Sequence, residues 1–171
     1  MLNFSVVGSS FAAALAVMAL TTAPASATIL GPDANICAKG DSPSVLVRVP
    51  ALKARTGNLR VQVYGNNSAD FLAKGKYLKR VDLPVTASGP MEVCVALPKA
   101  DHYAIAVRHD VDGNGKSGWS DGGGFSRNPS LSIFSLQPDY NKVVMTIGWK
   151  TQKIDVYMNY RKGTVIRPLK P

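Results

Sequence analysis

Residues 59–64, Leu-Arg-Val-Gln-Val-Tyr, decide the fold class of this 171-residue chain. The apolar residues Leu59, Val61 and Val63 alternate there with Arg60, Gln62 and Tyr64. Successive side chains of a β-strand point to opposite faces, so this period of two is typical of a strand with one face in a core and the other in water. The segment therefore predicts a half-buried strand.

The same extended character recurs along most of the chain. It is found at residues 45–49, 77–85, 91–97, 102–108, 143–149 and 154–160. Residues 69–74 allow one short helical turn, and residues 122–129 have little regular pattern. We expect the last two segments to close the fold as a hairpin through residues 150–153. The pattern predicts an all-β chain, a single antiparallel β-sandwich (Ig-like or transthyretin-like) of about seven or eight strands.

The first 27 residues have the layout of a secretory signal peptide. Residues 6–20 are apolar and uncharged, and Ala25, Ser26 and Ala27 form a small-residue cleavage motif. The apolar run is too short to span a membrane, so we expect no transmembrane segment after cleavage. A buried N-terminal helix is the alternative. The chain is therefore predicted to be periplasmic or secreted, with an N-terminal arm at 28–44, the sandwich at 45–162 and a basic tail at 163–171.

The two cysteines, Cys37 and Cys94, are an even pair in a chain that we expect to be exported. In an oxidising compartment such a pair predicts a disulfide. Neither cysteine has a second Cys or a His nearby in sequence, which argues against a metal or nucleophile role. Cys94 shares the outer face of its segment with Glu92, so a bridge would hold the arm across that face or along a sheet edge.

Basic residues give the chain a net charge of +9. Residues 48–80 hold eight Lys or Arg against Asp70, and residues 142–170 hold seven against Asp155. This balance predicts attraction to anionic partners such as polysaccharide or lipid head groups. The alternative is that both blocks are solvated outer faces of strands. Nucleic acid is not expected, because no recognised nucleic-acid-binding motif accompanies the charge.

Residues 109–121, His-Asp-Val-Asp-Gly-Asn-Gly-Lys-Ser-Gly-Trp-Ser-Asp, form a candidate Ca²⁺ loop, and Ca²⁺ is the one cofactor that the sequence suggests. Counting Asp110 as position 1 follows the ligand order of an EF-hand loop. The candidate ligands are Asp110, Asp112, Asn114, the carbonyl of Lys116, and Asp121. The flanking segments are not helical, so an EF-hand proper is excluded. An ion-free turn is the alternative, since Asp, Asn and Gly also form ordinary tight turns.

Catalytic motifs are absent from the sequence: it contains no G-x-S-x-G, H-E-x-x-H, P-loop or C-x-x-C pattern. We therefore do not expect an enzyme. A metal-assisted hydrolase centred on His109 is the alternative, although a catalytic zinc would usually need three protein ligands. His109, Trp119 and Phe125 are candidates for a ligand surface, and core packing is the other interpretation of such aromatic side chains.

Several motifs together resemble a known family. They are residues 57–64 (Gly-Asn-Leu-Arg-Val-Gln-Val-Tyr), Phe71, Leu97, residues 103–110 (Tyr-Ala-Ile-Ala-Val-Arg-His-Asp), 112–115 (Asp-Gly-Asn-Gly) and 124–128 (Gly-Phe-Ser-Arg-Asn). This series resembles domain-of-unknown-function family 2141, exported bacterial proteins with a small β-sandwich. The resemblance implies a fold and a compartment but no established activity. We therefore expect a binding or structural protein of the bacterial envelope.

Overall fold

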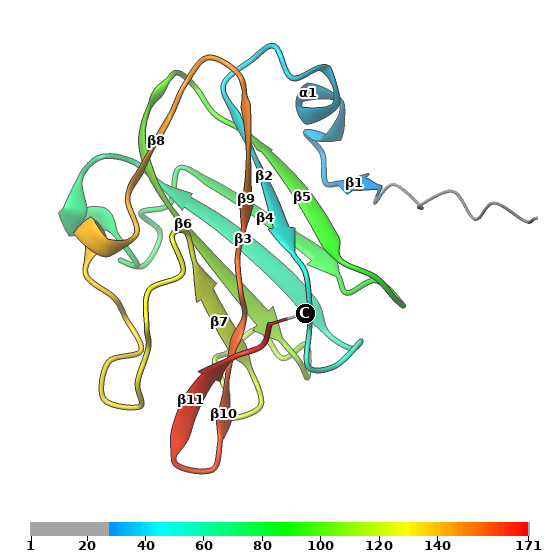
Figure 1. Ribbon diagram of the computed structural model, residues 1–171, viewed down its shortest axis with the longest axis vertical. Coiled ribbons are helices and arrows are strands. Elements are labelled where there is room, and N and C mark those ends of the chain that lie inside the picture. The colour runs from blue at the N-terminus through cyan, green and yellow to red at the C-terminus, as the bar shows by residue number, and fades with distance from the viewer. Residues whose placement is uncertain (1–27, 171) are drawn as a thin grey trace, which may run out of the picture.

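Residues 59–64 lie in strand β3 (Asn58–Tyr64) of the computed structural model, which describes residues 28–170. Two sheets pack face to face (Figure 1), so the predicted β-sandwich is confirmed. The expected signal peptide, residues 1–27, lies outside the described residues. No helix between residues 28 and 170 is long and apolar enough to cross a membrane.

The smaller sheet has four strands in the order β1-β5-β2-β9. They are β1 (Ile29–Leu30), β5 (Met91–Ala96), β2 (Ser44–Val49) and β9 (Thr151–Asp155). β2 and β5 are antiparallel, whereas β1 runs parallel to β5 and β9 runs parallel to β2. The two edge strands, β1 and β9, are far apart in sequence, so this sheet joins the start of the described chain to a late segment of it.

The larger sheet has seven strands, ordered β11-β10-β7-β6-β3-β4, with β8 also paired to β6. Besides β3 they are β4 (Lys79–Pro84), β6 (Asp101–Asp110), β7 (Gly122–Phe125), β8 (Met145–Ile147), β10 (Asn159–Lys162) and β11 (Val165–Pro168). Every neighbouring pair is antiparallel. β6 is paired on both sides and delivers the chain into the candidate loop.

The core lies between the two sheets and follows the predicted alternation. Leu59, Val61 and Val63 are fully buried, and Met91 and Val93 of β5 belong to the same cluster. Burying one such side chain stabilises the fold by about 1.5–3 kcal/mol. Because alternate residues enter this core, the others must face outward, and this leaves polar and basic side chains on the outer faces.

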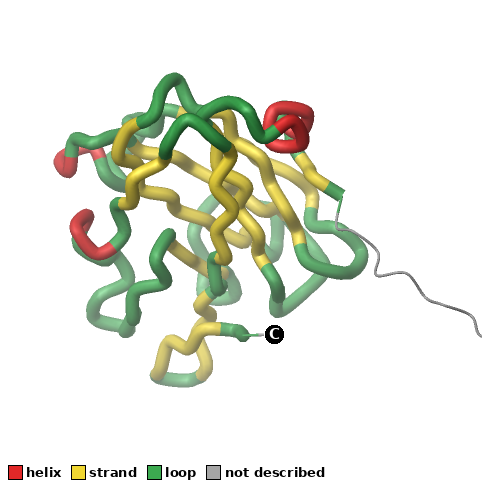
Figure 2. The backbone as a smooth tube through the Cα atoms, turned by 45° about the horizontal axis from the view of Figure 1, so that its top comes forward, coloured by secondary structure: helices red, strands yellow, loops and turns green. Residues whose placement is uncertain are grey.

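Three short helical segments lie at the periphery of the sheets (Figure 2). They are α1 (Ala34–Lys39), η1 (Ser68–Asp70) and η2 (Tyr140–Lys142). The single helical turn expected at residues 69–74 is η1, which begins one residue earlier and ends sooner. The arm at residues 28–44 contains β1 and α1.

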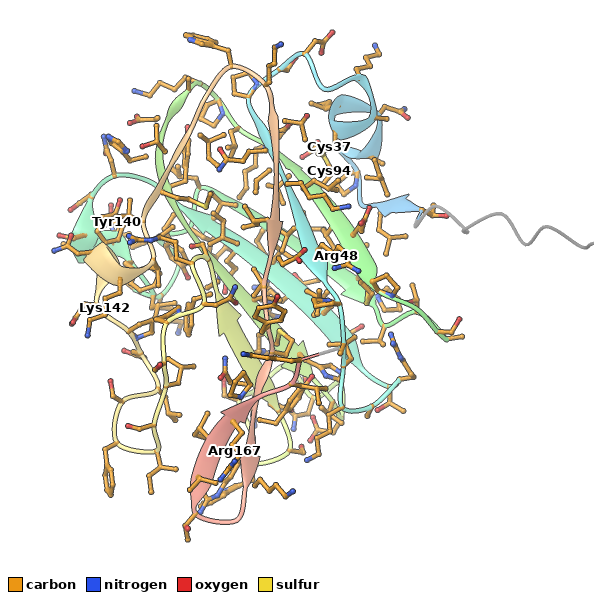
Figure 3. The ribbon with its side chains drawn as sticks, viewed as in Figure 1. Cys37, Arg48, Cys94, Tyr140, Lys142 and Arg167 are labelled. Carbon is orange, nitrogen blue, oxygen red and sulfur yellow. A yellow bond between two sulfur atoms is a disulfide. The ribbon has the colours of Figure 1, made fainter. Side chains whose placement is uncertain are left out.

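The predicted disulfide joins Cys37 of α1 to Cys94 of β5, with 5.9 Å between their Cα atoms (Figure 3). Both cysteines are buried against Leu46 on the outer face of the smaller sheet. The arm therefore crosses that outer face, as the position of Cys94 beside Glu92 predicts. A buried disulfide is compatible with a periplasmic or extracellular location.

The sequence pattern did not predict strand β7, because three of its four residues are glycine and glycine is disfavoured in strands. Packing explains two of these glycines. A Cβ on Gly122 would lie 2.3 Å from the Tyr160 ring, and one on Gly124 would lie 2.7 Å from Val156. Glycine thus allows the C-terminal segment to pack directly against β7.

The closing hairpin expected from residues 143–149 and 154–160 does not form. β8 pairs with the start of β6, whereas β9 crosses to the smaller sheet and pairs with β2. Alternation shows which side chains are buried but not which strand is the partner. β5 occupies one edge of β2, so the other edge is free to place Val47 opposite Ile154.

The basic tail expected at residues 163–171 contains a strand. Residues 165–168 form β11, which makes a tight hairpin with β10 through Gly163, whose φ is +60°. Arg161 lies opposite Ile166, and Tyr160 lies opposite Arg167. Opposite residues of an antiparallel pair share a face, so Arg161 and Arg167 project from different faces of the hairpin.

Reducing the disulfide should destabilise the protein by up to about 4 kcal/mol, because the bridge closes a long loop in the unfolded chain. Urea unfolding with and without dithiothreitol measures the difference. The double variant Cys37→Ser/Cys94→Ser is the control and should show no response to the reductant. An equal urea midpoint for reduced and oxidised wild type would contradict a stabilising bridge.

Replacing Gly57 should be much more costly than replacing Gly75. Both have a left-handed backbone, with φ of +73° and +75°. A Cβ on Gly57 would lie 1.8 Å from the Asp110 carbonyl oxygen, whereas nothing lies within 4 Å of one on Gly75. Gly75→Ala should cost the conformational penalty alone, about 1–2 kcal/mol. Gly57→Ala should lower the free energy of unfolding, measured with urea, by clearly more than this. Equal losses of stability in the two variants would show that the close approach of the Asp110 carbonyl to Gly57 is unimportant.

Candidate functional site

The candidate loop connects β6 to β7 and is held at both ends. Thr56 donates its hydroxyl to the carbonyl of Val111 at 2.9 Å, and the Val111 N–H donates to Asp121 Oδ1 at 3.0 Å. Gly113 and Gly115 have φ of +68° and +77°, a conformation that glycine adopts without strain. These bonds fold the loop back on itself, so that its last carboxylate returns to its first residues.

Three of the five predicted ligands come together in this loop. Asp110, Asp112 and Asp121 each offer a carboxylate oxygen within 4.8 Å of the other two. Ca²⁺ binds oxygen at about 2.3–2.6 Å, so ligands on opposite sides of one ion are separated by about 5 Å. The cluster therefore has the dimensions of a single Ca²⁺ coordination shell.

Asp110 is the most constrained member of the cluster, with only 3% of its surface exposed. Its Oδ2 accepts from the Gly115 N–H at 2.8 Å and from Arg108 Nη2 at 3.0 Å. Its Oδ1 is buried and has no hydrogen-bond partner within residues 28–170. Burial alone would raise the pKa of Asp110, but the Gly115 bond and the charge of Arg108 outweigh it and hold the pKa below 3.8. The carboxylate is therefore charged at neutral pH.

The other predicted ligands are engaged in the turn itself. Asp112 accepts from both the N–H and the side-chain amide of Asn114, at 3.2 and 2.6 Å. Asn114 Oδ1 in turn accepts from the Lys116 N–H at 2.7 Å, and Asp121 Oδ2 accepts from the Gly118 N–H at 2.8 Å. The bonds from the Asn114 N–H to Asp112 and from the Lys116 N–H to Asn114 are those of Asx turns, and the other two also close the loop on itself. The geometry thus shares features with both alternatives, the ion site and the ion-free turn.

His109 lies apart from the loop carboxylates, because it points to the opposite face of β6 and is fully buried in the core. Its Nδ1 is 2.7 Å from the Tyr160 hydroxyl, and its Nε2 is 2.9 Å from the carbonyl oxygen of Thr56. Both ring nitrogens therefore have partners and neither faces solvent. This geometry fits a residue that joins strands, and it adds no support to the hydrolase alternative.

Trp119 and Phe125 line a common groove on the outer face of the larger sheet, with a volume of about 710 Å³. His109 does not share this surface, so the three residues do not form the single ligand surface that the sequence suggested. Phe125 is 8% exposed and packs edge-on against Phe71. Trp119 is 74% exposed and lies over the guanidinium of Arg161 at 3.5 Å.

Basic side chains gather in this groove, although no local sequence pattern predicts such a cluster. Those that line it are Arg60, Lys74, Arg80, Arg108 and Arg161. Asp82 fixes two of them, with its Oδ1 2.6 Å from Arg60 Nε and its Oδ2 2.5 Å from Arg80 Nε. The sequence signal was the pair of basic blocks, but only the folded sheet brings members of both blocks together.

The His109–Tyr160 pair generates a pH prediction. Burial raises the pKa of Tyr160 to about 12, compared with 10.0 for an ordinary tyrosine. Because the pKa is higher in the folded state than in the unfolded state, the neutral Tyr160 hydroxyl contributes fully to the stability of the fold below pH 10. This contribution is lost as the pH rises toward 12. Tyr160→Phe should be less stable than wild type near neutral pH. Over that alkaline range, however, its free energy of unfolding should fall by up to about 2 kcal/mol less than that of wild type. Urea unfolding at several alkaline pH values measures this, and parallel curves would contradict it.

The comparisons with known proteins agree with the resemblance seen in the motifs. No curated protein and no solved structure matches the chain. A family model described as an uncharacterized protein conserved in bacteria (DUF2141) matches residues 47–155, more than half of the chain. The match extends from β2 to β9 and includes the whole candidate loop, whereas Cys37 and the β10–β11 hairpin lie outside it. The chain belongs to this bacterial family of uncharacterized proteins.

Proposed function

We propose that this chain is an exported, non-enzymatic binding module of the bacterial envelope whose loop at residues 110–121 holds a Ca²⁺ ion. One observation carries the proposal: Asp110 Oδ1 is buried and unpartnered within the described residues, beside two further carboxylates. A buried charged oxygen without a partner is costly for a fold. A cation between the three carboxylates would remove that cost.

Arg108 compensates the charge of the loop only in part. It contacts Asp110 Oδ2, and within the described residues it has no ion pair with Asp112 or Asp121. Three carboxylates so close together repel one another, and this repulsion is relieved when a divalent cation lies between them. Charge balance therefore favours an ion with two positive charges over Arg108 alone.

The turn bonds in the loop are compatible with an ion. Each carboxylate oxygen has two lone pairs, so an oxygen that accepts one N–H can still coordinate a metal. Asp110, Asp112 and Asp121 would supply charged ligands, with the Asn114 amide and the Lys116 carbonyl as neutral ones. Ca²⁺ takes six to eight oxygens in a flexible arrangement, and water would complete the shell. Mg²⁺ requires a smaller and more regular octahedron, which suits such a loop less well.

The disulfide supports the exported part of the proposal, because such bonds persist in oxidising compartments. The position of the loop supports a binding role. Ser117, Gly118 and Trp119 form part of the groove wall, and an ion bound by Asp110 and Asp121 would hold that wall in place. A rigid, Ca²⁺-stabilised rim beside a groove is a binding architecture that needs no catalytic group.

Calcium should raise the melting temperature of the protein by several degrees. At a hundredfold excess over the dissociation constant, binding to the folded state alone is worth about 2.7 kcal/mol. Excess EDTA should reverse the shift, and Mg²⁺ should produce a smaller one. Asp112→Asn should reduce the response, because it removes a full charge but keeps an oxygen. Thermal melts followed by circular dichroism measure these shifts.

The matched control is Asp139→Asn, which removes the same charge from an exposed site in the 139–142 segment, away from the loop. This variant should keep the full response to calcium. Isothermal titration calorimetry of the EDTA-treated wild type should give a saturable heat with Ca²⁺. Superimposed melts together with no heat of binding would show that residues 110–121 form an ion-free turn.

A further inference from the structure

We propose that the groove on the outer face of the larger sheet is a binding site for anionic phospholipid at a membrane surface. Its arginines would bind the phosphate, and its apolar rim would enter the outer part of the lipid layer. This site borders the Ca²⁺ loop, whose residues 117–119 form part of its wall, but it does not require that ion. Positive charge, guanidinium groups with free donors and exposed apolar side chains occur together in this groove.

The side chains that line the groove are mainly basic. Five basic residues line the groove, whereas Asp121 is the one acidic residue among its lining residues. They come from four separate parts of the chain: Arg60 from β3, Lys74 and Arg80 from β4 and the segment before it, Arg108 from β6 and Arg161 from β10. Because outer positions of adjacent strands lie side by side, these residues form one cationic surface. A ligand with complementary charge would therefore be an anion.

The guanidinium groups are held in place but retain free donors. Arg60 and Arg80 each use Nε for Asp82, and Arg161 uses Nε for the Gly163 carbonyl at 2.7 Å. Arginine carries five N–H donors, so most of them remain available at each of these positions. Fixed guanidinium groups bind phosphate through paired hydrogen bonds and lose little side-chain entropy when they do so. Phosphate is therefore a suitable anionic group.

Exposed apolar side chains surround the same groove. The described residues have seven large hydrophobic side chains that are clearly exposed: Leu78, Trp119, Ile133, Phe134, Leu136, Trp149 and Val165. Trp119, Ile133 and Leu136 line the groove. Leu78, Phe134 and Val165 are each next in sequence to a lining residue. Val165 alternates with Ile166 along β11 and so points to the other face of the hairpin. Trp119, Ile133 and Leu136, with Phe134 between the last two in sequence, form an exposed apolar patch where the arginines are, and such a patch indicates an interaction site.

The chemistry of the rim favours lipid over a charged polysaccharide. Aliphatic side chains such as Ile133 and Leu136 gain little from a hydrated sugar but gain free energy on entering an acyl layer. Phe134 is 94% exposed at the tip of its loop. In Figure 1 this loop, drawn in yellow, descends along the left side of the sheets, and the red β10–β11 hairpin forms the lowest part of the larger sheet. An apolar loop tip beside a cationic floor matches a surface with acyl chains below phosphate groups.

Sedimentation with lipid vesicles tests the proposal. The purified protein should bind vesicles of phosphatidylcholine with phosphatidylglycerol, should not bind pure phosphatidylcholine, and should be released by salt. Binding should persist in EDTA, which separates this proposal from the Ca²⁺ loop. Equal binding to both vesicles would overturn the proposal, as would binding to a soluble acidic polysaccharide such as polygalacturonate without binding to vesicles.

The two tryptophans provide the sharpest control. Trp119 is 74% exposed in the groove, and Trp149 is 73% exposed outside it. Trp119→Ala should weaken binding to the anionic vesicles about tenfold, whereas Trp149→Ala should leave it unchanged. In Trp149→Phe, Trp119 is the remaining indole, and its emission should shift to the blue with anionic vesicles. Equal binding by the two alanine variants, or no spectral shift, would overturn the proposed site.

Charge and shape can be tested with equally matched pairs. Arg161→Gln should weaken binding about fivefold, the value of one basic group near an anionic surface. Arg167 of β11 is labelled in Figure 3. The register places it on the opposite face of the hairpin from Arg161, so Arg167→Gln removes the same charge but should have a smaller effect. Gly123 is in the groove and Gly148 is not, and a Cβ on either meets nothing within 4 Å. Gly123→Leu should therefore block binding while Gly148→Leu preserves it, and the reverse result would exclude the groove.

Discussion

The alternation of side chains along β6 is the constraint on which the rest of the structure depends. Both edges of β6 are hydrogen-bonded to other strands, so its register is firmly set. Ile105, Val107 and His109 must then enter the core, while Arg108 and Asp110 lie on the outer side. A slip of one residue would exchange the two sets. The register that builds the core therefore also places a guanidinium and a carboxylate at the start of the loop.

The outer face of the larger sheet is only partly covered, and this produces the groove. At one end an aromatic cluster packs over Tyr64 and Phe125, and the Tyr140 hydroxyl fixes it by donating to the Gly65 carbonyl at 2.8 Å. Tyr140 reaches this position from η2, beside Lys142 (Figure 3). Beyond this cluster lie Arg60 and Arg108, whose side chains are only partly covered, with 17% and 20% of their surface exposed. Aromatic packing and cationic surface thus meet within one groove.

The loop and the groove are physically connected. Arg108 lines the groove and contacts both Asp110 and Ser117 of the loop, while Trp119 covers Arg161 of the hairpin. Any ion that orders the loop would therefore also order one wall of the groove. A bound cation would in addition increase the positive potential beside Arg108, and this would strengthen attraction to an anion. The family match covers the loop but not the β10–β11 hairpin. The loop side of this surface therefore lies within the part of the chain that matches the family, and the hairpin side lies outside it.

The sequence by itself determined the fold class, the disulfide and most of the strands, because period-two alternation and an even pair of cysteines are local signals with a direct physical meaning. The carboxylate cluster was also foreseen, since all three residues belong to one loop. Only the tertiary structure decided which strands pair, because alternation specifies a buried face and not a partner: β9 joins β2 rather than forming a hairpin. It alone separated His109 from Trp119. It also gathered basic residues from four parts of the chain into one groove, which no local pattern can encode.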